Sequence, residues 1–540
     1  MFARLSSLYR PDTVQTSMGV SAIATVVQRA VGFGRGVALA WLISQAQFGL
    51  FGVALLTLNV LLPLCSIGLH EGIARYAAFH EAGGTLKRFA LRVCLLLAGV
   101  TAATATALWV FSEPLGGVLF SSTQTSLTGA NGDSGAAGQM GLARAVACCT
   151  AALAAYHAML GFLRGLRMFR AHAGAEVFSA SLFTALAIGG AYLGFDTAES
   201  LVWSYAVSSL VTVLILLGPL IARVTAATAT TSPNHSTPTP REDDAQSPTA
   251  KRPAAPAQPP GADLSRDRTS TSRLITFSLW SAATAITWHA TSYFPMWYLL
   301  KVSDAAAVGT FHAVRMLTQF VQVGAVMMTM VIAGHATRDW EHRGREFALP
   351  RLALMTKLAL VAILATATAL SLLRPILLRL FPAGFAAGSA AYDPLLLFFL
   401  LSGAVGLIAV RLNLVEKPRL VFVAWLVGMS VNVATVFAML GSPTSSGIAA
   451  TEAIVAAAWA GCCGLGAATA TVLVLARRSG VGLDLGAVIL LMASLAVALG
   501  RPFAVAAMIL VVVVCARTSW IITRQDFASV IERLRRRDAR

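Results

Sequence analysis

The stretch VQTSMGVSAIATVVQRAVGFGRGVALAWLI, residues 14–43, decides the fold class, because it is apolar and long but carries Arg29 near its middle. A bilayer-spanning helix needs about 20 predominantly apolar residues. At a rise of ~1.5 Å per residue, Arg29 then lies roughly 20 Å from either end of its helix. A guanidinium near the bilayer centre costs ~2.5–3.5 kcal/mol on insertion scales, so it normally faces a partner or a water-filled cavity. The stretch therefore predicts a membrane helix whose arginine has a function.

The composition of the whole chain agrees with a membrane protein. Its 540 residues are 57% hydrophobic and only 12% charged, and the mean hydropathy is +0.72. A soluble protein carries about twice that charged fraction, ~25%. Alternation with a period of two residues, which a membrane barrel needs, is absent. The sequence predicts an all-α polytopic membrane protein.

Apolar segments of spanning length recur along the chain and number about 14. We predict them at residues 14–43, 48–70, 89–111, 141–163, 174–195, 200–222, 274–300, 305–333, 352–373, 394–414, 420–440, 447–475, 485–500 and 502–522. With both termini in the cytoplasm, most of the 41 Lys and Arg fall in cytoplasmic loops and tails. This asymmetry follows the positive-inside rule and predicts a multi-pass membrane protein with cytoplasmic N- and C-termini. The net charge of +17 then faces anionic membrane lipids, and nucleic acid is not implied.

A shift of 260 residues relates two halves of the chain. It places Gly49, Phe51, Glu81 and Gly84 on Gly309, Phe311, Glu341 and Gly344, and it sets His289 opposite Arg29. Because each half holds six predicted spans, the halves share one orientation, as in transporters built from parallel repeats. The predicted domains are an N-terminal lobe (1–222), a disordered Pro-rich cytoplasmic linker (223–273), a C-terminal lobe (274–476), two additional helices (477–523) and a basic cytoplasmic tail (524–540).

Four residues are candidates for binding an anionic substrate. Arg315 lies about as deep in its span as Arg29, Arg35 lies nearer the outer face, and His289 lies mid-span within WHATSYFPMWY. No deep carboxylate is evident that would pair with these cations, since residues such as Glu176 fall near predicted span ends. A satisfied intramembrane histidine is the other interpretation of His289, and a snorkelling side chain is the other interpretation of Arg35. Pro295 should kink the span that carries His289.

Motifs for catalysis are missing from the sequence. The run Gly32-Phe33-Gly34-Arg35-Gly36 resembles a phosphate loop in letters only, because no strand precedes it and no Lys-Ser/Thr follows. No Walker motif, catalytic triad or metal-ligand spacing appears, so the sequence predicts neither an enzyme nor a cofactor or metal site.

Several segments resemble one transporter family. FGLFGVALLTLNVLLPLCSIGLHEGIARYAA (48–78), GFLRGLRMFRAHAGAEV (161–177), VGTFHAVRMLTQF (308–320) and EKPRLVFVAWLVGMSVNV (416–433, with Asn432) resemble the polysaccharide biosynthesis flippases. These belong to the multidrug/oligosaccharidyl-lipid/polysaccharide exporter superfamily. VVQRAVGFGRG (26–36) resembles the first helix of lipid II flippases, and Arg29 and Arg35 take the positions of two arginines that contact pyrophosphate there. Gly36 departs from the acidic residue common in that group, and the long linker is unusual.

The resemblance implies a V-shaped pair of six-helix lobes that flips undecaprenyl-pyrophosphate-linked oligosaccharide by alternating access, for surface polysaccharide or lipopolysaccharide assembly. Arg29, Arg35, Arg315 and His289 would line the central cavity, and glycan-assembly machinery would be the partner. A drug/cation antiporter of the same superfamily and a membrane polysaccharide polymerase or ligase remain as alternatives. The sequence does not indicate the coupling ion.

Overall fold

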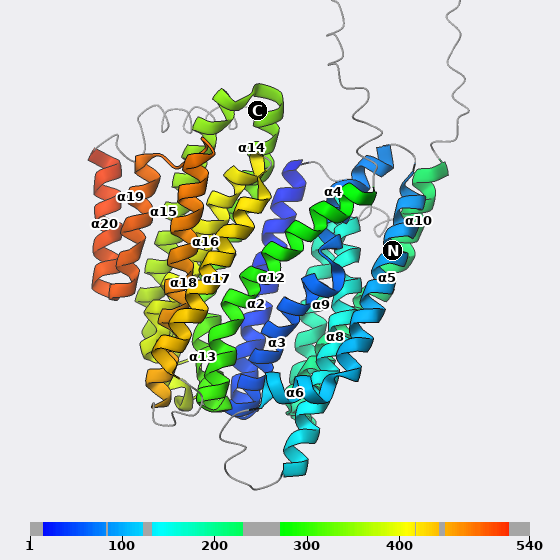
Figure 1. Cartoon of the computed structure of the whole chain (residues 1–540), viewed down its shortest axis with the longest axis vertical. Coiled ribbons are helices and arrows are strands. Elements are labelled where there is room, and N and C mark those ends of the chain that lie inside the picture. Colours follow the sequence, from blue (N-terminus) through cyan, green and yellow to red (C-terminus); the bar gives the residue numbers. More distant parts are fainter. Residues whose placement is uncertain are drawn as a thin grey trace, which may run out of the picture.

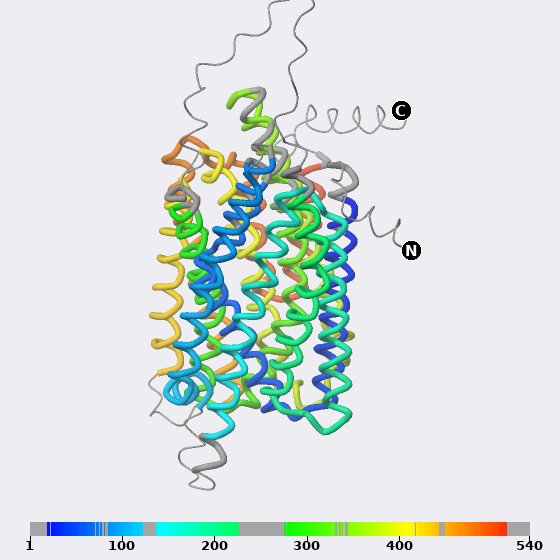
Figure 2. The backbone as a smooth tube through the Cα atoms, turned by 90° about the vertical axis from the view of Figure 1, so that its right-hand side faces the viewer, coloured from blue at the N-terminus to red at the C-terminus, as the bar shows by residue number. Residues whose placement is uncertain are grey.

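The computed structural model describes residues 14–82, 85–121, 132–229, 271–415, 417–441 and 449–517, and these are helical apart from short turns. Figure 1 shows a bundle of helices side by side, and the view turned by 90° in Figure 2 shows that most helices follow one common axis. The basic tail and residues 230–270 of the predicted linker lie outside the described residues. The predicted all-α polytopic membrane fold is confirmed.

The first lobe holds the helices of six predicted membrane spans. They are α2 (Val14–Leu42), α3 (Gln45–Ser66) continued by α4 (Leu69–Ala82), α5 (Leu86–Val110), α8 (Gly132–Gly165), α9 (Phe169–Tyr192) and α10 (Ala198–Ala229). A short helix, α6 (Ser112–Phe120), follows α5.

The second lobe repeats this order. Its passes are α12 (Thr271–Val302), α13 (Ala305–Thr318) continued by α14 (Phe320–Arg343), α15 (Arg345–Leu378), α16 (Tyr392–Leu414), α17 (Pro418–Leu440) and α18 (Ala450–Arg478). The turn η2 (Ala383–Ala391) precedes α16, and α19 (Leu485–Ser494) with η3 (Leu495–Leu499) and α20 (Arg501–Arg517) forms the two additional passes.

Among the residues described, nine helices are long and apolar enough to cross a membrane, judged by length and composition alone. The remaining predicted passes correspond to the more polar α2 and α12, the interrupted pair α13–α14, and the short α19–η3 and α20. We call the end of the bundle where α10 stops and α12 begins the linker end, and the opposite end the far end. Helices α4 and α14 extend past the predicted spans at the linker end. Helix α4 runs to Ala82 and α14 runs to Arg343, and both are more polar there.

The two lobes touch most closely where α3 crosses α13 near the far end. A Cβ added at Gly49 would lie 2.1 Å from the carbonyl oxygen of Ala305, and one at Gly309 would lie 2.2 Å from the carbonyl oxygen of Gln45. The 260-residue shift relates these two contacts to each other, so this crossing lies on the pseudo-symmetry axis. Only glycine allows such close approach of two backbones.

Further contacts between the lobes close the far end. Lys301 on α12 donates to the carbonyl and hydroxyl oxygens of Ser121, both at 2.9 Å. The indole of Trp41 donates to the carbonyl of Leu380 at 2.8 Å, and Gln45 bonds to Thr310. The lobes are therefore sealed against each other at the far end.

Replacing Gly309 with valine should open the far end. The added side chain would collide with the backbone at Gln45, so the sealed arrangement would lose stability relative to one with the lobes apart at this end. In a background without the seven native cysteines, a Gln45→Cys reporter should react faster with a membrane-impermeant maleimide after the Gly309→Val change. Gly99→Val on α5 is the matched control, because nothing lies within 4 Å of its Cβ position. Equal labelling in both variants would contradict the assignment of this crossing as a seal.

Candidate functional site

A large cavity separates the lobes on the side of the seal that faces the linker end. Its volume is about 2350 Å³. It extends from mid-bundle residues such as Asn59 and Ser402 to Lys417 and Arg419 at the α16–α17 connection. Both lobes contribute to its wall, and the structure is therefore sealed at the far end and hollow toward the linker end.

Apart from the phenol of Tyr76, the ionisable side chains of this wall are imidazoles and cations. His70 on α4 and His157 on α8 come from the first lobe, with their ring centroids 5.8 Å apart, and His289 on α12 comes from the second. Lys417 and Arg419 add fixed positive charge near the linker end. None of the described residues that line the cavity is an Asp or a Glu. The wall thus favours an anionic ligand over a cationic one.

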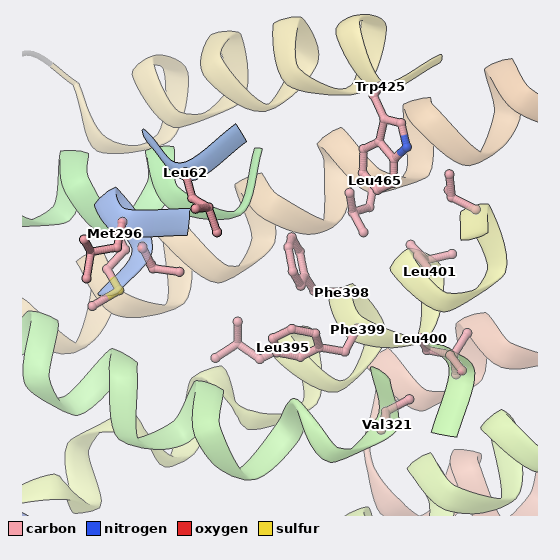
Figure 3. Close-up of a cluster of buried hydrophobic side chains, with 14 of the residues drawn as sticks. Leu62, Met296, Val321, Leu395, Phe398, Phe399, Leu400, Leu401, Trp425 and Leu465 are labelled. Atoms are coloured by element: carbon pink, nitrogen blue, oxygen red, sulfur yellow. The ribbon is translucent and has the colours of Figure 1, made fainter. Parts of the chain in front are cut away.

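The second lobe gives the same cavity an aromatic wall. Trp280 and Trp288 lie on α12, Trp340 on α14 and Trp425 on α17, and all four line the cavity. The indole of Trp288 donates to the hydroxyl of Ser402 at 3.3 Å. Figure 3 shows Trp425 above the packed side chains of Phe398 and Phe399, which form the apolar core of this lobe. Trp425 joins the aromatic wall to this core, since it belongs to the same buried cluster.

Arg315 lies behind the wall and not on it. Its side chain is only 8% exposed, and its guanidinium donates to the carbonyl oxygen of Ser292 at 2.9 Å. The Phe399 ring lies 5.6 Å from its Cζ atom. Within the described chain no carboxylate pairs with Arg315. The guanidinium lies within electrostatic range of His289, which does line the cavity. The guanidinium therefore adds positive potential to the wall from inside the lobe.

The Ser292 carbonyl that Arg315 binds is next to the carbonyl of Thr291 in α12, which is continuous from Thr271 to Val302. Pro295 has no N–H, so the carbonyl of Thr291 lacks its usual helical donor. The fully buried amide of Asn432 on α17 donates to that oxygen at 2.5 Å. Arg315 and Asn432 thus donate to two consecutive carbonyls of α12, and the kink expected at Pro295 stays a prediction.

Arg29 has an acidic neighbour, so the expectation that no deep carboxylate lies near it is wrong. Helix α9 begins at Phe169, five residues before the predicted span, which places Glu176 two turns inside it. The carboxylate of Glu176 lies 3.4 Å from Nδ1 of His172 and within electrostatic range of Arg29 and Arg164. The Arg29 side chain itself is exposed.

Arg35 is half-buried between helices of the first lobe. Its guanidinium carbon lies 3.9 Å from the centroid of the Phe183 ring on α9, and Tyr205 on α10 lies within electrostatic range. Neither Arg29 nor Arg35 lines the cavity in this structure. Of the four candidate residues, His289 lines the cavity and Arg315 is buried behind the cavity wall. Arg29 and Arg35 lie beside α9 instead. Their role in binding stays a prediction.

Two cavity histidines were missed by sequence reasoning. His157 lies in the last third of α8 and inside the predicted span 141–163, so the argument that selected His289 as an intramembrane imidazole applies to it as well. His70 falls at the end of the predicted span 48–70, where nothing in the sequence distinguished it from a loop residue.

Comparison with known proteins identifies the fold. No family model matches the chain, and no curated protein matches its sequence. Among solved structures, an inward-facing multidrug resistance MATE family transporter of the MOP superfamily aligns with a TM-score of 0.57 at 14% identity, over 85% of this chain and 99% of that one. Lipid II flippase MurJ in an inward closed conformation aligns with a TM-score of 0.57 at 12% identity, over 91% of this chain and 96% of that one.

A third match is a MOP superfamily transporter from Pyrococcus furiosus, described as having a binding pocket of reverse polarity. Its TM-score is 0.56 at 14% identity, over 88% of this chain and 97% of that one. The chain therefore has the fold of MOP superfamily transporters. At these identities the likeness extends to the fold, and the choice among substrates rests on the residues of the cavity.

Proposed function

We propose that this protein is a flippase that moves undecaprenyl-pyrophosphate-linked oligosaccharide across the bacterial inner membrane by alternating access, for surface polysaccharide assembly. The observation that carries the proposal is the lining of the cavity, which combines three histidines and two fixed cations with four tryptophans and has no carboxylate among its described residues. A pyrophosphate is bound by charge-assisted hydrogen bonds from such groups. The linker end faces the cytoplasm, as the distribution of Lys and Arg predicts.

The size of the cavity supports a large head group. Pockets for small molecules have volumes of roughly 300–1,000 Å³, and this cavity has about 2350 Å³. The oligosaccharide and pyrophosphate would occupy the cavity, while the polyprenyl chain stays in the lipid. Breaking the seal at Gly49 and Gly309 and closing the linker end would then expose the head group on the other side.

The drug/cation antiporter is the second candidate, since one observation favours it. Tryptophan faces attract organic cations, and four tryptophans line the cavity. The fixed charges of Lys417 and Arg419 oppose such a ligand. Glu176, the acid nearest to Arg29, does not line the cavity and is already close to His172.

Removing the cavity imidazoles tests the proposal. His157→Gln and His289→Gln should each lower flipping of fluorescent undecaprenyl-pyrophosphate oligosaccharide in proteoliposomes about tenfold, since a hydrogen bond to a charged group contributes ~1.5–3 kcal/mol. His80→Gln is the control, because His80 stacks on Phe89 outside the cavity. If the wild-type protein transports tetraphenylphosphonium and not the lipid, the antiporter replaces the flippase.

A further inference from the structure

The aromatic wall of the cavity has a regular layout along one helix. Trp280, Ser281, Thr284, Trp288 and His289 all line the cavity from α12, so they share one face of that helix. At ~1.5 Å per residue, the two indoles are separated by about 12 Å along the axis. Hydroxyl groups therefore alternate with aromatic faces over a length that suits several linked sugar rings.

The two indoles are held in fixed orientations. Trp280 contacts two side chains of α17: the guanidinium carbon of Arg419 lies 5.1 Å from its ring centroid, and the ring of Phe422 lies 5.7 Å away. Trp288 donates to Ser402, and its ring lies 4.4 Å from His289 and 6.4 Å from Trp425. Both indoles remain partly exposed, whereas Trp425 beneath them is only 5% exposed. Rings fixed by their own protein contacts lose little freedom when a ligand stacks on them.

The chemistry of this face matches a carbohydrate. A sugar ring presents C–H groups on its faces, which pack on an indole, and hydroxyls at its edge, which bond to side chains such as Ser281, Thr284 and Gln322. A lipophilic cation would meet Arg419 on Trp280 and His289 beside Trp288, both of which carry or can carry positive charge. The surroundings thus favour a neutral polyhydroxylated ligand on this wall.

We infer that the face of α12 carrying Trp280 and Trp288 is a glycan-binding wall, and that the imidazoles His70 and His157 on the opposite lobe take the pyrophosphate. The inference rests on the proposed function and adds a division of the substrate between the two lobes. The first lobe contacts the pyrophosphate through its imidazoles, whereas the second lobe contacts the glycan through its indoles and the pyrophosphate through His289 alone on α12. The complete head group therefore bridges the lobes while they are apart at the linker end. Glycan recognition would then be separable from anion recognition by mutation.

The test compares two ligands on purified protein by isothermal titration calorimetry: undecaprenyl pyrophosphate, and the same lipid carrying a tetrasaccharide. The wild type should bind the glycosylated lipid at least tenfold more tightly, because the sugar rings pack on two indoles and bond to nearby hydroxyls that the bare lipid does not reach. The double variant Trp280→Ala/Trp288→Ala should bind both lipids equally, with its affinity for the bare lipid unchanged. Trp203→Ala is the matched control, since that indole is exposed on α10 outside the cavity.

The conservative variant Trp280→Phe/Trp288→Phe keeps two aromatic faces and should retain part of the glycan preference, which separates stacking from a loss of folding. Equal loss of affinity for both lipids in the alanine variant would overturn the glycan-binding wall, as would an unchanged preference. Equal wild-type affinity for the two lipids would overturn the wall and leave the flippase proposal standing. Wild-type protein that binds neither lipid would overturn both.

Discussion

Replacing Arg315 with methionine should leave the protein at least as stable as the wild type and lower its transport rate at least tenfold. The guanidinium is buried, and its one hydrogen bond within the described chain is to the Ser292 carbonyl. Burying an ion costs several kcal/mol even after the surroundings relax, and an apolar side chain of similar volume often replaces it without loss of stability. A charge retained under these conditions is explained by function. We expect its electrostatic effect on His289, which lines the cavity, to supply that function.

The measurement pairs the melting temperature of the purified protein with the initial rate of flipping per folded molecule. A tenfold lower rate corresponds to ~1.4 kcal/mol of lost stabilisation. Arg144→Met is the matched control, since Arg144 bonds to Ser112 near the far end and its Cζ atom lies 5.3 Å from the Trp109 ring, away from the cavity. A lower melting temperature with a normal rate would assign Arg315 to holding α12 in place.

The membrane fold followed from the sequence because hydrophobic length and charge asymmetry act locally. The 260-residue shift also found Gly49 and Gly309, but the sequence could not show that the two glycines touch each other across the lobes. That contact depends on how the lobes associate. The helices α19–η3 and α20 are shorter than the other predicted spans, so length alone barely identifies them as membrane helices.

The site was harder to predict than the fold, because depth along a helix does not reveal the face on which a residue lies. Arg29 and Arg315 occupy similar depths, yet Arg315 is buried behind the cavity wall and Arg29 is exposed beside α9. An error of five residues in the start of α9 hid Glu176. The pairing of Asn432 with the carbonyl freed by Pro295 joins residues far apart in the chain, so no local pattern could indicate it.

Arg29→Ala should lower flipping of the lipid-linked oligosaccharide at least tenfold, whereas Glu176→Gln should lower it by less than about threefold, given ~1.5–3 kcal/mol for a hydrogen bond to a charged group. The Arg29 guanidinium is exposed at mid-depth and makes no hydrogen bond to the described residues, so it is available to pyrophosphate. Glu176 has His172 as a neighbour, and losing its charge leaves the substrate contact intact. Gln28→Ala, one position earlier on α2, is the control.

The double variant Arg29→Ala/Glu176→Gln separates a substrate contact from a structural ion pair. If Arg29 served to neutralise Glu176, removing both charges would restore the rate that Arg29→Ala loses, because the carboxylate that needed the guanidinium would also be gone. If Arg29 binds the pyrophosphate, the double variant stays as slow as Arg29→Ala alone. We expect the second result, since an exposed guanidinium is more costly to keep at this depth than a neutral side chain unless a ligand uses it.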